Sequence, residues 1–348
     1  MNPVLLTLTE GSLSGGVEVY TRLLRQTFPA LSVIGRETLE KKGMNDSGWP
    51  FLNEVQHSKN MNAYLKQFSP RPSLILTNGM HGWALDSSLA DIPTVSILHG
   101  TFSGLADAAF SKTSPVYWRM RYLYASLEKK SAQKAQVVVT NSAFTQKEVL
   151  SRYGIPSRMI EPSIDTRIFS PGSQAKARNE LGWNAQRKVV LFVGNPTYSK
   201  GFDLIEQVAR AHPDIDFQCV TFPQASSTCS NVITSPPQIH ERMPLYYRAA
   251  DALLFPSRYE GFGFVPLEAL ACNCPVVTSK VGIFHDFVSP AAVVVPHDQG
   301  SFADAMKNVL ETKRPTKSHL DIASRFSMDS FSKKMKETIS SITKRGRV

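Results

Sequence analysis

Two glutamates eight positions apart, Glu260 and Glu268, bracket the glycine-containing stretch EGFGFVPLE. Pro266 suits the first position of a helix, because the missing N–H of proline would have no partner there anyway. Glu268 is therefore expected in the first turn, where unpaired N–H groups and the helix dipole favour an anion. Amides at a helix start can hold a phosphate, and carboxylates accept the paired hydroxyls of sugars. The stretch predicts a sugar-nucleotide site.

The plain alternative is an amphipathic helix with two solvated glutamates, and for the isolated spacing it would be preferred. The flanking sequence favours the binding site instead. An apolar run, Ala252–Phe255, comes before the stretch, and another, Val276–Thr278, follows it. Strand, loop, helix and strand in succession form the unit in which α/β proteins place ligands at the carboxyl ends of strands.

The elements that would position these residues alternate throughout the chain. Apolar runs bounded by turn residues predict strands, and the segments between them have helical patterns. Strands of this kind are typical of parallel sheets covered on both faces. We therefore expect an α/β protein with two Rossmann-like domains facing each other across a cleft. The expected boundaries are an N-terminal domain at 1–171, a C-terminal domain at 172–320, and a C-terminal segment at 321–348 whose helix packs back toward the N-terminal domain.

Composition limits the other possibilities. The chain has 348 residues, enough for two ordinary domains, with 42% hydrophobic and 20% charged residues. No apolar run approaches the ~20 residues of a membrane span, and the first residues do not resemble a signal peptide. The four cysteines show neither metal-ligand spacing nor a disulfide framework, so a cytoplasmic location is expected. The net charge of +10 suits phosphorylated substrates, anionic lipid or nucleic acid.

Several weak motifs occur in an order that is specific when taken together. With these motifs the chain resembles, nearly end to end, the retaining GT-B glycosyltransferases of glycosyltransferase family 4, also called glycosyl transferases group 1. The motifs that carry the resemblance are Gly15-Gly16, Leu98-His99-Gly100, Val138–Ser142, Tyr153–Pro156, Ile164-Asp165, Val193-Gly194, Lys200-Gly201 and Pro256–Ala269.

The resemblance assigns roles to residues of this sequence. It implies a GT-B fold in which the N-terminal domain binds the acceptor and the C-terminal domain binds a nucleoside-diphosphate sugar. Glu260 would bind hydroxyls of the transferred sugar and Glu268 the ribose. His99 would lie near the donor sugar, although a single histidine at a strand end is more often structural. The backbone that approaches the sugar and the diphosphate would be that of Gly15, Gly16, Gly261, Phe262, Gly263 and Phe264.

Lys200 follows the expected strand Val189–Val193, where a cation would stabilise a leaving diphosphate. Family members commonly carry an arginine just after the first glycine of this strand end, and here Asn195 occupies that place. Arg258 or Arg242 is the candidate substitute. The implied catalytic residues are thus His99, Lys200 and Glu260, with Asn195 among the donor-binding positions.

No metal or other cofactor is expected. The sequence Asp214-Ile215-Asp216 has the form of a metal-binding DxD motif, but it lies in an expected helix-to-strand turn and is read as solvated turn residues. There is no nucleophile motif. This favours front-face attack but leaves a covalent intermediate open.

The predicted function is transfer of a sugar from a nucleoside diphosphate to a hydroxyl of a glycan or lipid-linked saccharide, in cell-surface polysaccharide or glycoconjugate biosynthesis. A nucleotide-sugar epimerase on the same fold is one alternative, which would act without an acceptor. A basic nucleic-acid-binding protein ranks lower, because no nucleic-acid motif is present. The basic and aromatic stretch Tyr117–Lys134 could contact an anionic membrane from the cytoplasmic side, or could be a surface helix with its aromatic side chains in the core.

Overall fold

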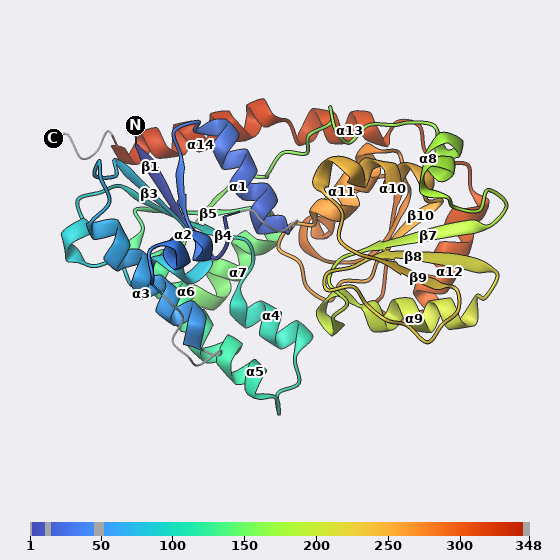
Figure 1. Cartoon of the computed structure of the whole chain (residues 1–348), viewed down its shortest axis with the longest axis horizontal. Helices are drawn as coiled ribbons and strands as arrows, with labels where there is room; N and C mark the ends of the chain where they lie inside the picture. Colours follow the sequence, from blue (N-terminus) through green and yellow to red (C-terminus); the bar gives the residue numbers. More distant parts are fainter. Residues whose placement is uncertain (1, 11–14, 45–51, 344–348) are drawn as a thin grey trace. The chain divides into compact units, whose positions relative to one another are not determined.

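The computed structural model describes residues 2–10, 15–44 and 52–343. The chain divides into two compact units, one made of Met1–Pro162 with Met328–Val348 and the other of Ser163–Ser327. Each unit contains a six-stranded parallel sheet with helices around it (Figure 1). The expected α/β architecture with two parallel sheets is confirmed. The division lies nine residues ahead of the expected boundary at 171, and residues 321–327 belong to the second unit.

The sheet of the first unit has the strand order β2-β1-β3-β4-β5-β6. The chain leaves β1 for β2 on one side and then continues with β3 on the other side, so the winding reverses between β1 and β3. Such a switch point opens a crevice at the carboxyl ends of the two strands. The strands are β1 (Pro3–Leu6), β2 (Ser32–Ile34), β3 (Leu74–Asn78), β4 (Thr94–Leu98), β5 (Val137–Thr140) and β6 (Arg158–Met159).

Helices of the first unit include the last one of the chain, α14, which packs on α1. The ring of Phe331 meets that of Tyr20 edge-on at 5.4 Å, and the hydroxyls of Ser332 and Thr27 lie 3.0 Å apart. The helices are α1 (Gly16–Thr27), α2 (Arg36–Lys41), α3 (Asn53–Lys66), α4 (Phe102–Ala109), α5 (Pro115–Trp118), the π-helical η4 (Arg119–Tyr124), α6 (Ala125–Lys134), α7 (Ala143–Tyr153) and α14 (Met328–Thr343), with short 3-10 turns η2 (Gly79–Gly82) and η3 (Ser87–Leu89).

The second sheet has the order β12-β11-β10-β7-β8-β9. Its winding reverses between β7 and β10, which pair in parallel through Leu191 and Leu253. The carboxyl ends of β7 and β10 therefore frame the switch point of this unit. The strands are β7 (Lys188–Val193), β8 (Ile215–Val220), β9 (Val232–Ser235), β10 (Ala252–Phe255), β11 (Val276–Ser279) and β12 (Ala292–Val295).

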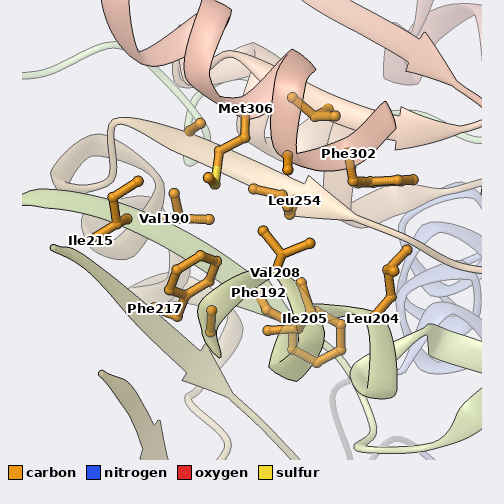
Figure 2. Close-up of a cluster of buried hydrophobic side chains, with 14 of the residues drawn as sticks. Val190, Phe192, Leu204, Ile205, Val208, Ile215, Phe217, Leu254, Phe302 and Met306 are labelled. Carbon is orange, nitrogen blue, oxygen red and sulfur yellow. The ribbon is translucent and has the colours of Figure 1, made fainter. Parts of the chain in front are cut away.

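Helices cover both faces of the second sheet. On one face, α9 and α12 contribute Val208, Phe302 and Met306 to a buried cluster with Val190 and Leu254 of the sheet (Figure 2). The other face carries α8, α10 and α11, with α13 packed against α11. The helices are α8 (Gln174–Leu181), α9 (Phe202–Ala211), α10 (Met243–Ala249), α11 (Phe264–Ala271), α12 (Gln299–Glu311) and α13 (Ser318–Arg325), with 3-10 turns η5 (Tyr198–Lys200), η6 (His240–Arg242) and η7 (Gly282–His285).

Two details at the candidate site differ from the expectation. Helix α11 begins at Phe264, because Gly263 adopts a left-handed φ of 108° and caps it. Pro266 is therefore the third helical residue, which is tolerated because its N–H would still lack an intrahelical partner. The expectation that Glu268 lies in the first turn is wrong, since that turn contains no acidic residue.

Candidate functional site

The second unit brings Lys200 and Glu260 into direct contact. Lys200 follows β7 at the end of η5, and Glu260 lies on the loop between β10 and α11. Lys200 Nζ is 2.6 Å from Glu260 Oε1, and the hydroxyl of Ser257 donates to the same oxygen at 2.8 Å. This pair thus lies at the switch point between β7 and β10, the place where parallel α/β sheets bind ligands. An ammonium has three hydrogens, so Lys200 can bind Glu260 and still donate to an anion.

Glu268 is buried and both of its oxygens are occupied. Its Oε1 lies 3.1 Å from Nε2 of His240, and its Oε2 accepts from the hydroxyl of Tyr247 at 2.9 Å. His240 belongs to η6 and Tyr247 to α10, so the carboxylate of α11 is held by two other elements. The ring of Phe169 packs edge-on against His240 at 4.8 Å. These contacts, rather than the helix start, fix the orientation of the Glu268 carboxylate.

Two glycines let neighbouring segments approach the Glu260 loop closely. A Cβ on Gly201 would lie 2.0 Å from the carbonyl oxygen of Pro256, and one on Gly282 would lie 2.3 Å from that of Phe262. The Phe262 carbonyl also accepts the N–H of Ile283 at 2.8 Å. The loop is thus held between η5 and η7, next to the first turn of α11. The backbone N–H groups of that turn have no carbonyl partner within the helix.

Asn195, the position where the resemblance led us to look for an arginine, has an exposed side chain. Of the two suggested substitutes, Arg258 is engaged elsewhere. It donates to both oxygens of Asp203, at 2.7 and 2.8 Å, and its guanidinium stacks 3.5 Å from the ring centre of Tyr198. Arg242 is exposed at the end of η6. The cation placed against Glu260 is therefore Lys200.

In the first unit, Gly15 is the N-cap of α1 and Gly16 its first residue. The side chain of Glu18 turns back toward this cap, so that a Cβ on Gly15 would lie 2.3 Å from its Oε2. Glu18 Oε1 also accepts the hydroxyl of Thr9 at 2.6 Å. Because residue 15 is a glycine, the Glu18 carboxylate can lie beside the start of α1 while it accepts the hydrogen bond from Thr9.

His99 follows β4 and is held by side chains of neighbouring strands. Its Nε2 lies 3.1 Å from Oδ1 of Asn78, the last residue of β3, and Asn78 Nδ2 donates to Thr7 Oγ1, just after β1, at 3.0 Å. The ring of Tyr20 meets His99 edge-on at 4.7 Å, and Asn141 Nδ2 is 3.4 Å from the carbonyl of His99. Burial lowers the pKa of His99 to about 4, so the imidazole is neutral at pH 7.

Sequence reasoning missed the residues that hold the predicted ones in place. These are Thr7, Asn78, His240, Tyr247 and Ser257. Thr7, Asn78 and Ser257 carry a usable signal, because each is a polar residue at or just after the end of an apolar strand. His240 and Tyr247 lie 28 and 21 positions from Glu268, and their contact depends on how α10 and η6 pack.

The basic and aromatic stretch forms α5, η4 and α6. Trp118 and Tyr122 stack with ring centres 5.1 Å apart, and both are more than half exposed, while Tyr117 and Tyr124 are buried. Leu123 is also exposed. The aromatic side chains thus divide between the core and one exposed pair. No helix in the described ranges is both long and apolar enough to cross a membrane.

The DxD-like sequence has no free pair of carboxylates. Asp216 lies in β8 and forms an ion pair with Arg187, Nε to Oδ1 2.6 Å. Within residues 2–10, 15–44 and 52–343, no three His, Cys, Asp or Glu side chains are grouped so as to hold a metal ion.

Known proteins similar to this chain include a D-inositol 3-phosphate glycosyltransferase from Mycobacterium sp. strain JLS, which is 30% identical over 255 residues. The matched stretch is 67% of this chain and 57% of that relative, so the chain corresponds to little more than half of it. Sucrose-phosphate synthase from Thermosynechococcus elongatus superposes with a TM-score of 0.76 over 98% of this chain and 99% of that one, at 20% identity. HepE from Anabaena, in complex with UDP-glucose, superposes with a TM-score of 0.73 over 97% and 99%, at 18% identity.

Two family models match consecutive parts of the chain. Residues 14–168 match Glycosyltransferase Family 4, and residues 187–312 match Glycosyl transferases group 1. The first range contains Gly15, Gly16 and His99, and the second contains Lys200, Glu260 and Glu268. The fold, the paired residues at the switch point of the second sheet and both family matches agree, and the chain belongs to the GT-B glycosyltransferases of family 4, the glycosyl transferases group 1.

Proposed function

We propose that the protein is a retaining hexosyltransferase. It transfers a sugar from a nucleoside diphosphate to a hydroxyl of a glycan or lipid-linked saccharide, in the biosynthesis of a cell-surface polysaccharide or glycoconjugate. The observation that carries this proposal is the contact of Lys200 with Glu260 at the switch point between β7 and β10. One group there can neutralise a diphosphate and the other can bind sugar hydroxyls, within hydrogen-bond distance of each other.

The roles follow from charge and hydrogen-bonding capacity. As the bond between the anomeric carbon and the diphosphate breaks, negative charge grows on the leaving oxygen, and Lys200 with the amides at the start of α11 stabilises it. Glu260 accepts hydroxyls of the transferred sugar, and Glu268 accepts those of the ribose. As the acceptor oxygen bonds to the anomeric carbon, its hydroxyl proton passes to the departing diphosphate oxygen, which carries the charge left by the broken bond. The donor binds the second unit and the acceptor the first.

Uridine nucleotides are the first donors to test, because the similar Anabaena protein was solved with UDP-glucose. A thermal-shift screen should compare UDP-, GDP- and ADP-sugars, since a bound donor raises stability by mass action. Transfer to saccharide acceptors is then measured with the stabilising donor. Lys200→Ala should lower kcat about 100-fold or more, as loss of a transition-state hydrogen bond does. Lys307→Ala, an exposed lysine of α12, removes the same charge and should leave kcat unchanged.

The outcomes separate the candidate functions. No stabilisation by any nucleotide sugar would contradict donor binding altogether. Conversion of the sugar nucleotide without an acceptor would point to an epimerase. Full transfer activity in Lys200→Ala would remove the role given to that residue. The anomeric configuration of the product, read by NMR, decides between retention and inversion.

We also propose that transfer needs no metal ion, because Lys200 and the backbone amides at the start of α11 can themselves neutralise the charge of a diphosphate. The rate of sugar transfer should be the same with and without EDTA in the assay. A rate that falls with EDTA and returns with Mg²⁺ or Mn²⁺ would contradict this proposal.

For the stretch Tyr117–Lys134 we propose peripheral contact with an anionic membrane on its cytoplasmic side. The exposed Trp118–Tyr122 pair and Leu123 offer aromatic and apolar area, and Lys130 is exposed on the following helix. Co-sedimentation with vesicles containing phosphatidylglycerol should fall in the Trp118→Ala, Tyr122→Ala double variant. Leu320→Ala, an exposed apolar residue of α13, is the control. Equal binding by the double variant would exclude this surface.

A further inference from the structure

The side chains of Thr7, Asn78 and His99 form one hydrogen-bonded row across three neighbouring strands of the first unit. Thr7 follows β1, Asn78 ends β3 and His99 follows β4, and the sheet order places these strands side by side. The row therefore crosses the switch point between β1 and β3. Thr7 and Asn78 are both buried.

The row determines which nitrogen of His99 carries the proton. Asn78 Nδ2 donates to Thr7, so it is the carbonyl oxygen Oδ1 that faces His99. A carbonyl oxygen can only accept a hydrogen bond. Nε2 of His99 must therefore be the protonated nitrogen, and in a neutral ring Nδ1 then carries the lone pair.

Other contacts favour the same neutral, fixed ring. Burial alone lowers the pKa of His99, with no contribution from a charged neighbour. The rings of Tyr20 and His99 pack edge-on, and Asn141 Nδ2 donates to the backbone carbonyl of His99. In the described part of the chain, Asn78 is the one hydrogen-bond partner of the His99 ring.

We propose that Asn78 is a positioning residue that holds His99 as the neutral Nε2–H tautomer and leaves Nδ1 to accept a hydrogen bond from a substrate hydroxyl. The tautomer follows from the contacts above, whereas the use of Nδ1 rests on the proposed transferase function. Thr7 acts one step further away, because its hydroxyl oxygen accepts the hydrogen bond from Asn78 Nδ2.

The tautomer can be measured without any activity assay. In the protein labelled with ¹⁵N-histidine, two-dimensional NMR separates protonated from unprotonated ring nitrogens, and the signals missing in His99→Gln identify His99. We expect Nε2 protonated and Nδ1 unprotonated at every pH from 6 to 8. Asn78→Asp replaces the amide by a carboxylate of the same shape, which should favour the doubly protonated ring in this range. In Thr7→Val, whose side chain keeps its shape, both tautomers should be visible.

Transfer activity then tests the use of Nδ1. Asn78→Asp should lower kcat about tenfold or more at pH 7 with a smaller change in donor KM, and its rate should recover as the pH is raised and the ring loses its extra proton. A role in folding alone would lower the yield or the melting temperature without moving the pH–rate profile.

The possible failures are distinct. Protonated Nδ1 in the wild-type protein, or unchanged His99 signals in Asn78→Asp, would overturn the positioning role. The expected tautomer together with wild-type activity and pH profile in Asn78→Asp would overturn the use of Nδ1. The expected tautomer in a protein that transfers no sugar would instead contradict the proposed function, and the assignment of the tautomer would stand.

Discussion

Lys200 and Glu260 are 60 positions apart in the chain, yet their charged groups form an ion pair with a 2.6 Å separation. The lysine comes after β7 and the glutamate after β10, and these strands pair in the middle of the sheet. The pair is partly shielded from water, with the side chains 32% and 14% exposed. Both groups assigned to the donor are therefore already in contact before any ligand binds.

This contact predicts that the two residues act as a unit. Lys200→Met, Glu260→Gln and the double variant should give a coupling free energy of unfolding of about 0.5–1 kcal/mol, the range for partly exposed ion pairs. For transfer, each single variant should lose nearly as much kcat as the double variant. Losses in kcat that multiply in the double variant would show that the residues act independently.

The contact of His240 with Glu268 predicts that His240 affects ribose binding. If Glu268 binds the ribose hydroxyls, His240→Ala should raise the Kd of a nucleoside diphosphate about tenfold, the equivalent of one hydrogen bond to a charged group. The 2′,3′-dideoxy nucleotide lacks those hydroxyls, so the substitution should leave its Kd unchanged. Calorimetry with both ligands measures the difference. An equal loss for both would place the effect of His240 elsewhere in the site.

The buried carboxyl of Glu128 predicts a pH dependence of stability. Burial is the main reason that the pKa of Glu128 rises to about 7, although hydrogen bonds from Tyr153 and the Phe102 amide oppose it. In the unfolded chain the group has its ordinary pKa of 4.5. Between these values the folded state keeps a proton that the unfolded state has lost, so this group lowers stability as the pH rises from about 4.5 to about 7.

Glu128→Gln should remove that contribution. Relative to the wild type, the variant should gain about 3 kcal/mol in unfolding free energy between pH 4 and pH 8, measured with urea. Glu311→Gln, an exposed carboxyl at the end of α12, is the control and should show no such trend. A pH-independent difference between wild type and Glu128→Gln would mean that the carboxyl of Glu128 titrates normally.

Gly201 and Gly182 form a matched pair for testing the close approach of residue 201 to the Pro256 carbonyl. Both have a left-handed φ, 73° and 68°, but a Cβ on Gly201 would collide with the Pro256 carbonyl whereas none of the described atoms lies within 4 Å of one on Gly182. Alanine at position 182 should cost about 1 kcal/mol of backbone strain. Alanine at position 201 should cost at least about 2 kcal/mol more and weaken donor binding, because the Glu260 loop must move. Equal melting temperatures for Gly201→Ala and Gly182→Ala would show that the Glu260 loop moves at little cost in stability.

Sequence patterns predicted the parallel sheets well because buried strands read as continuous apolar runs, as in Val189–Val193 and Ala252–Phe255. Strand β6 has only two residues, both exposed, and carries no such signal. The π-helical turn Arg119–Tyr124 was expected to be part of an ordinary helix, since the two differ in hydrogen bonding and not in residue type.

In the candidate site, the places of Lys200 and Glu260 in the fold were predictable, because each of these residues follows a buried strand. The start of α11 was not predictable from the sequence. Pro266 suits several early helical positions, and the left-handed conformation of Gly263 fixes which one it takes. The partners of Glu268 and His99 come from other elements, so they became visible only with the order of the strands and the packing of the helices.

The hydrogen bond from Ile283 to the Phe262 carbonyl, with Gly282 packed beside it, has a thermodynamic consequence. Fixing the backbone of one loop residue costs roughly 1–2 kcal/mol in conformational entropy. In the Glu260–Gly263 loop much of that entropy is already lost in the folded protein. A ligand seated there would not have to order the loop, so differences in affinity among nucleotide sugars should come from the contacts that each sugar and base makes.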